Sequence, residues 1–242
     1  RCRLLTTFTG REQHLSNMGF LKKAWSIYAK DMVGEGRTRE RFITMSAFTL
    51  VIIIIFNFAF DTGTIEMQRI APGMMWVAFT FAGMLGVNRS FMPEKEQGSF
   101  EGLLLAPMDR GAIYLGKLLG NLTLIGMVEL LSLPLFALFL NIPIVKYLPG
   151  LILIFALGTI GFASIGTLFA AMAVHSRMRE VMLPILLFPL ASPILIAAVE
   201  TTGIVFRDGG WDELSSWINL LATFVVVFLA ASLLLFDYIL EE

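Results

Sequence analysis

Long apolar stretches, separated by short polar segments, dominate the pattern of this 242-residue chain. Six of them approach or exceed the roughly 20 residues that an α-helix needs to cross a bilayer. They are Phe42–Phe60, Ile70–Val87, Ala112–Leu140, Leu148–Val174, Val181–Phe206 and Ser216–Leu240. Open sheet edges are not tolerated in hydrocarbon, and these runs are too long for barrel strands. The pattern therefore predicts an all-α polytopic membrane protein, with a six-helix transmembrane domain over residues 42–242.

Prolines interrupt two of the predicted spans. Pro134 falls inside the third span, where we expect a kink because proline removes a backbone hydrogen bond. The fifth span contains Pro184, Pro189 and Pro193, which predict a broken helix or a segment that turns back before Glu200.

The residues before the first span differ in character. Positions 1–17 are polar and lack the apolar core of a signal peptide, so we expect an extension that is not part of the fold. From Phe20 to Asp31, apolar residues recur at helical spacing opposite lysines, which predicts an interfacial amphipathic helix within a segment over 18–41. The alternative is the solvated start of a longer first helix.

The composition narrows the class further. The chain is 57% hydrophobic and 15% charged, whereas soluble domains carry about 25% charged residues. A net charge of −1, without a basic patch, gives no indication of nucleic-acid binding. One cysteine excludes an intramolecular disulfide and a cysteine-based metal cluster, and two histidines are too few for an all-histidine site. We therefore predict no directly bound cofactor or metal.

Lysine and arginine are distributed unevenly between the two sides that six spans define. Fifteen of the 18 precede the first span or lie in the second-to-third and fourth-to-fifth connections. Cytoplasmic segments of membrane proteins carry the excess of these residues. The asymmetry predicts that both termini and the second-to-third connection face the cytoplasm.

The second-to-third connection, Arg89–Lys117, is the largest charged island between the first and last spans. It is longer than a simple turn requires. We predict a short amphipathic coupling helix around Pro93–Leu104 that docks on a soluble partner. Phe100 and three leucines would be its apolar anchors, and its charged residues would form the rim. The candidate coupling residues are Glu94, Glu96, Gly98, Phe100, Glu101, Leu103, Leu104, Leu105, Pro107 and Arg110.

Two polar residues within the spans are candidates for a functional role, and Glu129 is the more informative. An ionisable group at that depth costs roughly 2.5–3.5 kcal/mol on insertion scales and is often functional. The alternative is a protonated side chain hydrogen-bonded to a neighbour, for instance Asn57 or Ser132. Asn57 is therefore the second intramembrane candidate, and both interpretations stand at this point.

The start of the third span nearly matches a nucleotide-binding motif. Gly111–Leu118 resembles the phosphate-binding loop, but Leu118 supplies no hydroxyl for magnesium and no strand precedes it. We expect any ATP to be bound by another polypeptide. Gly116 and Gly120 instead form a G-x-x-x-G pair, which predicts close helix packing.

The charged island also carries a resemblance to a known family. The stretch Glu94–Pro107, followed by Arg110 and Lys117, resembles the cytoplasmic loop of ABC-2-type permeases. Within that group it is most similar to the haem exporter B family, CcmB. The family's Ala-Pro-Gly-x-x-Trp pattern is matched by Ala71, Pro72, Gly73 and Trp76. The resemblance covers Phe20 to Leu240.

This resemblance implies a non-catalytic permease subunit in the bacterial inner membrane that serves haem export or haem-chaperone release in c-type cytochrome biogenesis. It implies two permease copies with two CcmA-like ATPase subunits, which bind the ATP. A CcmC-like haem-handling membrane subunit and a small CcmD-like single-span subunit complete the expected complex. Haem is a candidate cargo, although no histidine or cysteine lies within a predicted span.

Two alternative functions differ from this one, the first in its cargo and the second in its functional class. An ABC-2 permease that exports a drug, lipid or polysaccharide would have the same architecture. A channel or secondary transporter would need no ATPase, but the sequence shows no inverted repeat and one clear mid-membrane charge. A membrane enzyme has the least support, because the sequence offers no catalytic constellation.

Overall fold

The computed structural model describes residues 19–60, 65–96, 98, 109–140, 142–174, 176 and 178–239. Every regular element in these ranges is an α-helix. The helices are α2 (Phe20–Thr38), α3 (Glu40–Ala59), α4 (Ile65–Asn88), α5 (Met92–Glu96), α7 (Arg110–Leu140), α8 (Ile144–Ala173), α9 (Arg179–Phe206) and α10 (Trp211–Ile239). Six of them are long and apolar enough to cross a membrane. The prediction of an all-α polytopic membrane protein is confirmed.

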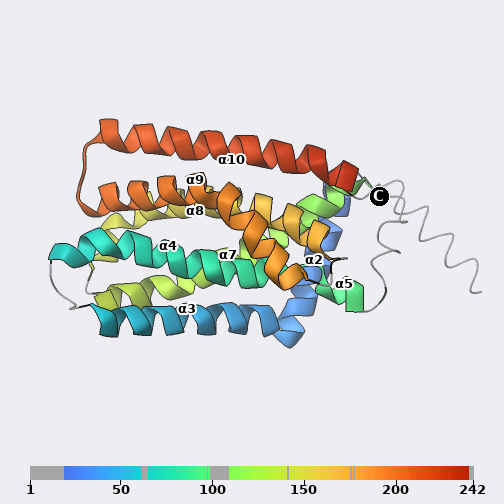
Figure 1. Ribbon diagram of the computed structural model, residues 1–242, viewed down its shortest axis with the longest axis horizontal. Helices are drawn as coiled ribbons and strands as arrows, with labels where there is room; N and C mark the ends of the chain where they lie inside the picture. Colours follow the sequence, from blue (N-terminus) through green and yellow to red (C-terminus); the bar gives the residue numbers. More distant parts are fainter. Residues whose placement is uncertain are drawn as a thin grey trace, which may run out of the picture.

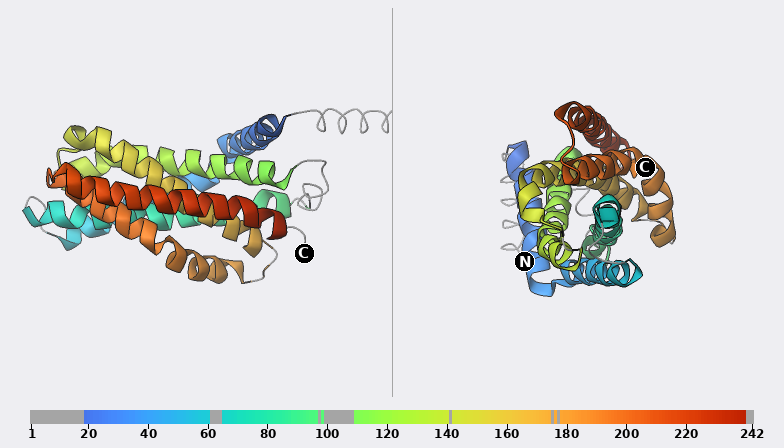
Figure 2. Two further views of the ribbon diagram at one scale, coloured as in Figure 1. Left: turned by 90° about the horizontal axis from the view of Figure 1, so that it is seen from above. Right: turned by 90° about the vertical axis from the view of Figure 1, so that its left-hand side faces the viewer.

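The long helices α3, α4 and α7 to α10 run side by side as an elongated bundle (Figure 1). Helix α2 lies across one end of this bundle. Helix α5, the start of α7 and the end of α10 lie at the same end, as the left view of Figure 2 also shows. We call it the α2 end. The ends of α3, α7 and α9 lie at the opposite end.

Helices α4 and α8 form the centre of the bundle. In their apolar windows 67% and 72% of residues are buried, compared with 17% in α3 and in α10. Small residues allow the close approach. A Cβ atom added to Gly158 of α8 would lie 2.2 Å from the Trp76 ring of α4. The outer helices consequently leave apolar faces free for lipid or for other membrane subunits.

Helix α2 is separate from the first span. It ends at Arg39, whose left-handed backbone (φ 54°) turns the chain before α3 begins at Glu40. The Glu35 carboxylate accepts a hydrogen bond from the Phe42 amide at 3.0 Å, which caps the start of α3. The alternative of a longer, continuous first helix is therefore not observed, and α2 extends further than predicted, to Thr38.

Helix α9 corrects the prediction of a broken or re-entrant fifth span. It is one continuous helix from Arg179 to Phe206, with all three prolines inside it. It bends midway but does not turn back (Figures 1 and 2). Pro193 cannot donate to the Pro189 carbonyl, and the Ser192 hydroxyl donates to it instead at 2.8 Å. A side chain thus replaces the missing backbone donor, as transmembrane helices often require.

We predict that Gly158→Ala lowers the thermal stability of the purified protein, because its Cβ would collide with the Trp76 ring. Gly126→Ala in α7 is the matched control, since a Cβ there meets nothing within 4 Å. Without a collision, glycine to alanine in a helix stabilises by about 1 kcal/mol. Thermal unfolding in mild detergent should therefore shift in opposite directions for the two variants. Equal shifts would contradict the packing described here.

Candidate functional site

The short helix α5 is fastened to the bundle by one acidic residue. Glu94 is only 4% exposed and points inward. Its Oε1 atom lies 2.8 Å from the Lys117 ammonium of α7, and Lys30 of α2 donates to the same oxygen. One carboxylate therefore connects three helices that are distant in sequence.

Lys117 is the centre of this arrangement, and its ammonium is fully buried. Besides Glu94, it contacts the Asp31 carboxylate of α2 at 2.9 Å and the Ser90 carbonyl at 2.8 Å. It also lies over the Phe91 ring, 5.1 Å from the ring centre. These contacts replace the water that a buried ammonium loses. We call Lys30, Asp31, Glu94 and Lys117 the Lys117 cluster.

Lys30 forms the solvent-facing side of the cluster. Burial alone would lower the pKa of its ammonium, but hydrogen bonds and charges from Glu94 and Asp31 outweigh burial and raise the pKa. The Lys30 ammonium lies 3.2 Å from the Asp31 carboxylate. Two cations and two anions therefore balance one another at this junction.

A glycine lets α2 cross α7 beside the Lys117 cluster. A Cβ atom on Gly116 would lie 2.7 Å from the Ile27 Cβ and 2.8 Å from the Ala24 carbonyl oxygen, both in α2. At Gly120 an added Cβ would meet only Met32, at an ordinary 3.7 Å. The close approach thus falls at Gly116, and its partner there is α2.

A second polar network ties the spanning helices together at the α2 end. Arg41 of α3 donates to the Gly86 carbonyl of α4 at 2.8 Å and to the Asn121 side-chain oxygen of α7 at 2.5 Å. The Asn121 amide donates in turn to Thr167 of α8 at 2.9 Å. Four spanning helices are therefore linked through polar side chains near the junction that holds α5.

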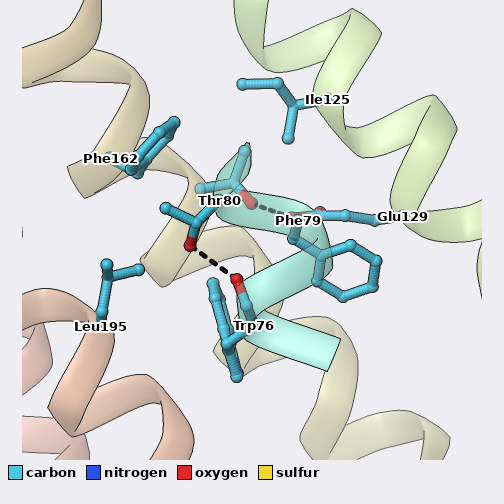
Figure 3. Close-up of a pocket in the computed structure, with 8 residues that line it drawn as sticks. Trp76, Phe79, Thr80, Ile125, Glu129, Phe162 and Leu195 are labelled. Atoms are coloured by element: carbon cyan, nitrogen blue, oxygen red, sulfur yellow. Dashed lines mark hydrogen bonds between the residues drawn. The ribbon is translucent and has the colours of Figure 1, made fainter. Parts of the chain in front are cut away.

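The buried polar residue of the bundle centre is Glu129. Figure 3 shows its side chain among residues of α4, α7, α8 and α9, at a cavity of about 10 Å³, which is close to the space that one water needs. The Thr159 hydroxyl of α8 donates to its carboxyl group at 2.5 Å. The hydrogen-bond partners predicted for the Glu129 side chain, Asn57 and Ser132, were wrong. Asn57 donates to the Phe139 carbonyl, and Ser132 donates to the main-chain carbonyl of Glu129.

Trp76, the last residue of the Ala-Pro-Gly-x-x-Trp pattern, lies at the same cavity. Its indole N–H donates to the Thr202 hydroxyl of α9 at 3.0 Å. Its ring packs edge-on against Phe79 and Phe155. Ala71 and Pro72 are also buried, whereas an added Cβ at Gly73 would meet open space. Trp76 thus joins α4 to α8 and α9.

The coupling residues predicted in the second-to-third connection fall into three groups. Glu96 and Gly98 are exposed, and Arg110 is partly buried at the start of α7. Glu94 corrects the prediction, because it points into the protein rather than forming part of an exposed rim. Outside the described residues lie Phe100, Glu101, Leu103, Leu104, Leu105 and Pro107.

The predicted helix around Pro93–Leu104 is not continuous through Gly98, and residues 99–104 lie outside the described part of the chain. Helix α5 ends at Glu96, and Gly98 has a φ of 61°. An α-helix cannot continue through that backbone conformation, which glycine adopts readily. The left-handed glycine therefore separates α5 from whatever follows it.

Sequence reasoning missed three residues of the site, namely Asp31, Lys30 and Arg41. Lys117 was considered as the end of the charged island, in the family resemblance and in a failed nucleotide motif, but not as a buried ion-pair partner. It lies in the first turns of α7. A signal was present, because a lysine at the start of an apolar helix requires a partner when it is buried. The identity of that partner depends on the tertiary fold.

The fold and the site define a polytopic membrane protein in which buried charges fasten a short helix to the spanning bundle. The family model described as CcmB protein matches residues 22–238. The chain belongs to the CcmB family. It is therefore a non-catalytic permease subunit with a role in cytochrome c biogenesis.

Three relatives named heme exporter protein B illustrate the similarity. The chain is 32% identical to the Pseudomonas aeruginosa protein over 149 residues, which is 62% of this chain and 66% of the relative. It is 32% identical to the Rhodobacter capsulatus protein over 154 residues, or 64% and 70%. It is 32% identical to the Haemophilus influenzae protein over 166 residues, or 67% and 75%. The chain thus aligns with about two thirds of the Pseudomonas protein's length.

We predict that Lys117→Met destabilises the protein by about 3–5 kcal/mol, because it leaves buried carboxylates without their main partner. Lys22→Met, an exposed lysine of α2, is the control and should have little effect. The measurement is thermal and denaturant unfolding in mild detergent. In a double-mutant cycle with Glu94→Gln, the two losses should be much less than additive. Additive losses would mean that the two side chains do not interact.

Proposed function

We propose that the chain is the membrane permease of an ABC transporter complex for haem export or haem-chaperone release in c-type cytochrome biogenesis. A separate ATPase subunit would bind and hydrolyse the ATP. Family membership and the name of the relatives support this proposal. The observation that carries its mechanism is the buried attachment of Glu94 to Lys117.

The coupling path follows from the two ends of the second-to-third connection. This connection leaves α4 through α5 and enters α7, and the Lys117 cluster joins α5 directly to α7. An ATPase that displaces the connection would therefore move α5 and the start of α7 together. Asp31 would carry the same displacement to α2. Ion pairs in apolar surroundings resist separation, so the junction would move as one body.

Helix α2 has the surface of an interfacial helix. Ala24 and Ile27 are buried on one side, while Leu21 and Trp25 are exposed on the other, with Trp25 62% exposed. An exposed tryptophan on an amphipathic helix is typical of the membrane–water boundary. We propose that α2 lies in that boundary and slides along it when the junction moves.

The proposed orientation places the α2 end in the cytoplasm of a bacterial inner membrane. It rests on the 15 lysines and arginines that the six-span order assigns to that side. The ATPase would dock there. Two permease copies, a CcmC-like haem-handling subunit and a CcmD-like single-span subunit would use the exposed apolar faces of the outer helices, of which α3 and α10 are the least buried.

Haem is the candidate cargo of the complex, and we propose that the CcmC-like subunit ligates its iron. The cysteine and the two histidines of this chain, Cys2, His14 and His175, lie outside every predicted span. This chain would then contribute movement rather than coordination.

We predict that Glu101→Lys combined with Leu104→Asp abolishes ATPase binding and leaves membrane insertion intact, since both changes alter the proposed docking segment. Asp212→Lys, at the opposite end, is the charge control. The measurement is co-purification of the ATPase from membranes. Wild-type amounts of ATPase with the double variant would refute the docking proposal.

A second prediction separates docking from coupling. Glu94→Gln should keep the ATPase bound but lower maturation of a reporter c-type cytochrome by about 5- to 150-fold, the range of typical coupling free energies. Glu96→Gln is the matched control, because Glu96 lies two residues further along α5 and is exposed. Both variants should retain ATP hydrolysis by the complex. Normal maturation with Glu94→Gln would show that the buried attachment does not carry the coupling.

A further inference from the structure

A cavity of about 170 Å³ lies between α4 and α9 at the opposite end from the coupling junction. It is far larger than the cavity at Glu129 and can hold a group of several heavy atoms. Its lining consists of Arg69, Pro72, Val199, Glu200, Gly203 and Arg207. Neither the coupling path nor the family pattern explains this combination of charges.

Two helical stripes, one on α4 and one on α9, lead away from the cavity. On α9, Ile196, Glu200, Gly203 and Arg207 recur at the spacing of one helix face. On α4, Arg69 is followed at the same spacing by Gly73 and Val77. Pro72 faces Gly203, where an added Cβ would lie 3.8 Å from the proline ring.

The two stripes are polar at the cavity and apolar further along the helices. The spanning segments begin at Arg69 in α4 and end at Phe206 in α9, so both guanidinium groups lie at the membrane boundary. Deeper along the same stripes, Ile196 is 57% exposed and Val77 is 40% exposed. This gradient matches an amphipathic molecule whose charged group faces outward.

The charges select the kind of anion. The lining residues, two guanidinium groups and one carboxylate, carry a net charge of +1, and Arg207 also lies 3.9 Å from the Glu213 carboxylate in an exposed and therefore weak ion pair. A phosphodiester carries a single negative charge, and its oxygens fit the paired donors of arginine. A phosphate monoester carries close to two negative charges and would be repelled by Glu200.

We propose that this cavity binds the phosphodiester group of a glycerophospholipid from the adjacent leaflet. The phosphate lies between Arg69 and Arg207, and the acyl chains follow the exposed apolar stripes of α4 and α9. Glu200 disfavours lipids with a doubly charged headgroup. The bound lipid would brace α4 and α9 beside the hydrogen bond that joins Trp76 to Thr202.

The test is a lipid titration of the delipidated intact complex, read by native mass spectrometry with phosphatidylethanolamine as the probe. Arg69→Gln should lower the affinity of the tightest site about tenfold, as expected for the loss of one charge-assisted contact. Lys146→Gln is the matched control, since Lys146 is a cation of the same end that pairs with Asp208 at 2.5 Å. Equal affinities for wild type and Arg69→Gln would overturn the proposal. If Arg69→Gln does not assemble, Arg69→Lys keeps the charge but not the paired donors and should still show a weaker site.

Two further experiments identify whether the phosphodiester comes from a lipid and how the site selects between headgroup charges. Soluble glycerophosphoethanolamine should fail to displace the lipid at equal concentration, because it lacks acyl chains. Displacement as strong as by the lipid itself would mean a site for a free phosphodiester and overturn the assignment to the bilayer. Glu200→Gln should raise binding of phosphatidic acid relative to phosphatidylethanolamine. An unchanged ratio would refute the role given to Glu200.

Discussion

The buried ammonium of Lys117 is the constraint on which the α2 end depends. An ammonium without water must be surrounded by acceptors, and the protein brings them from three directions: Asp31 from α2, Glu94 from α5 and the carbonyl of Ser90 between α4 and α5. None of these elements can leave without exposing an unpaired charge to apolar surroundings. The position of α2 across the bundle follows, and Gly116 supplies the space that this position requires. The same requirement makes the junction a unit that transmits displacement, because separating its parts is costly.

The centre of the bundle is held differently. There α4 and α8 meet through small residues and aromatic rings, with Trp76 resting on Gly158. Such contacts depend on shape and permit small sliding movements, since no charge has to be uncovered. A rigid ionic junction at one end and an interface of packed surfaces in the middle are the two parts that a mechanical permease needs. In the proposed coupling, the first would receive a displacement, and the second would let the helices respond to it.

Hydropathy was sufficient to place the spans, because an apolar run of bilayer length has one stable conformation in a membrane. Each predicted span corresponds to one long helix. Prediction failed where a tertiary or side-chain partner decides the outcome. Pro193 did not break α9, because the hydroxyl of Ser192 replaces the lost donor. Glu94 was assigned to an exposed rim, since nothing in its local sequence shows that Lys117, 23 positions away, donates a hydrogen bond to it. The partner of Glu129 proved to be Thr159 for the same reason.

The electrostatic contrast between the two ends gives the molecule a direction. At the α2 end, the two cations and two anions of the Lys117 cluster cancel one another and close the junction. At the opposite end, Arg69, Arg207 and Glu200 surround a cavity and leave an excess of one positive charge. A balanced cluster favours internal cohesion, whereas an unbalanced cavity favours an anion from outside the chain. Because the continuous helices α4 and α9 reach from one end to the other, movement of the junction would alter the spacing of Arg69 and Arg207. The end proposed to receive force and the end proposed to hold a ligand would therefore be mechanically connected within one chain.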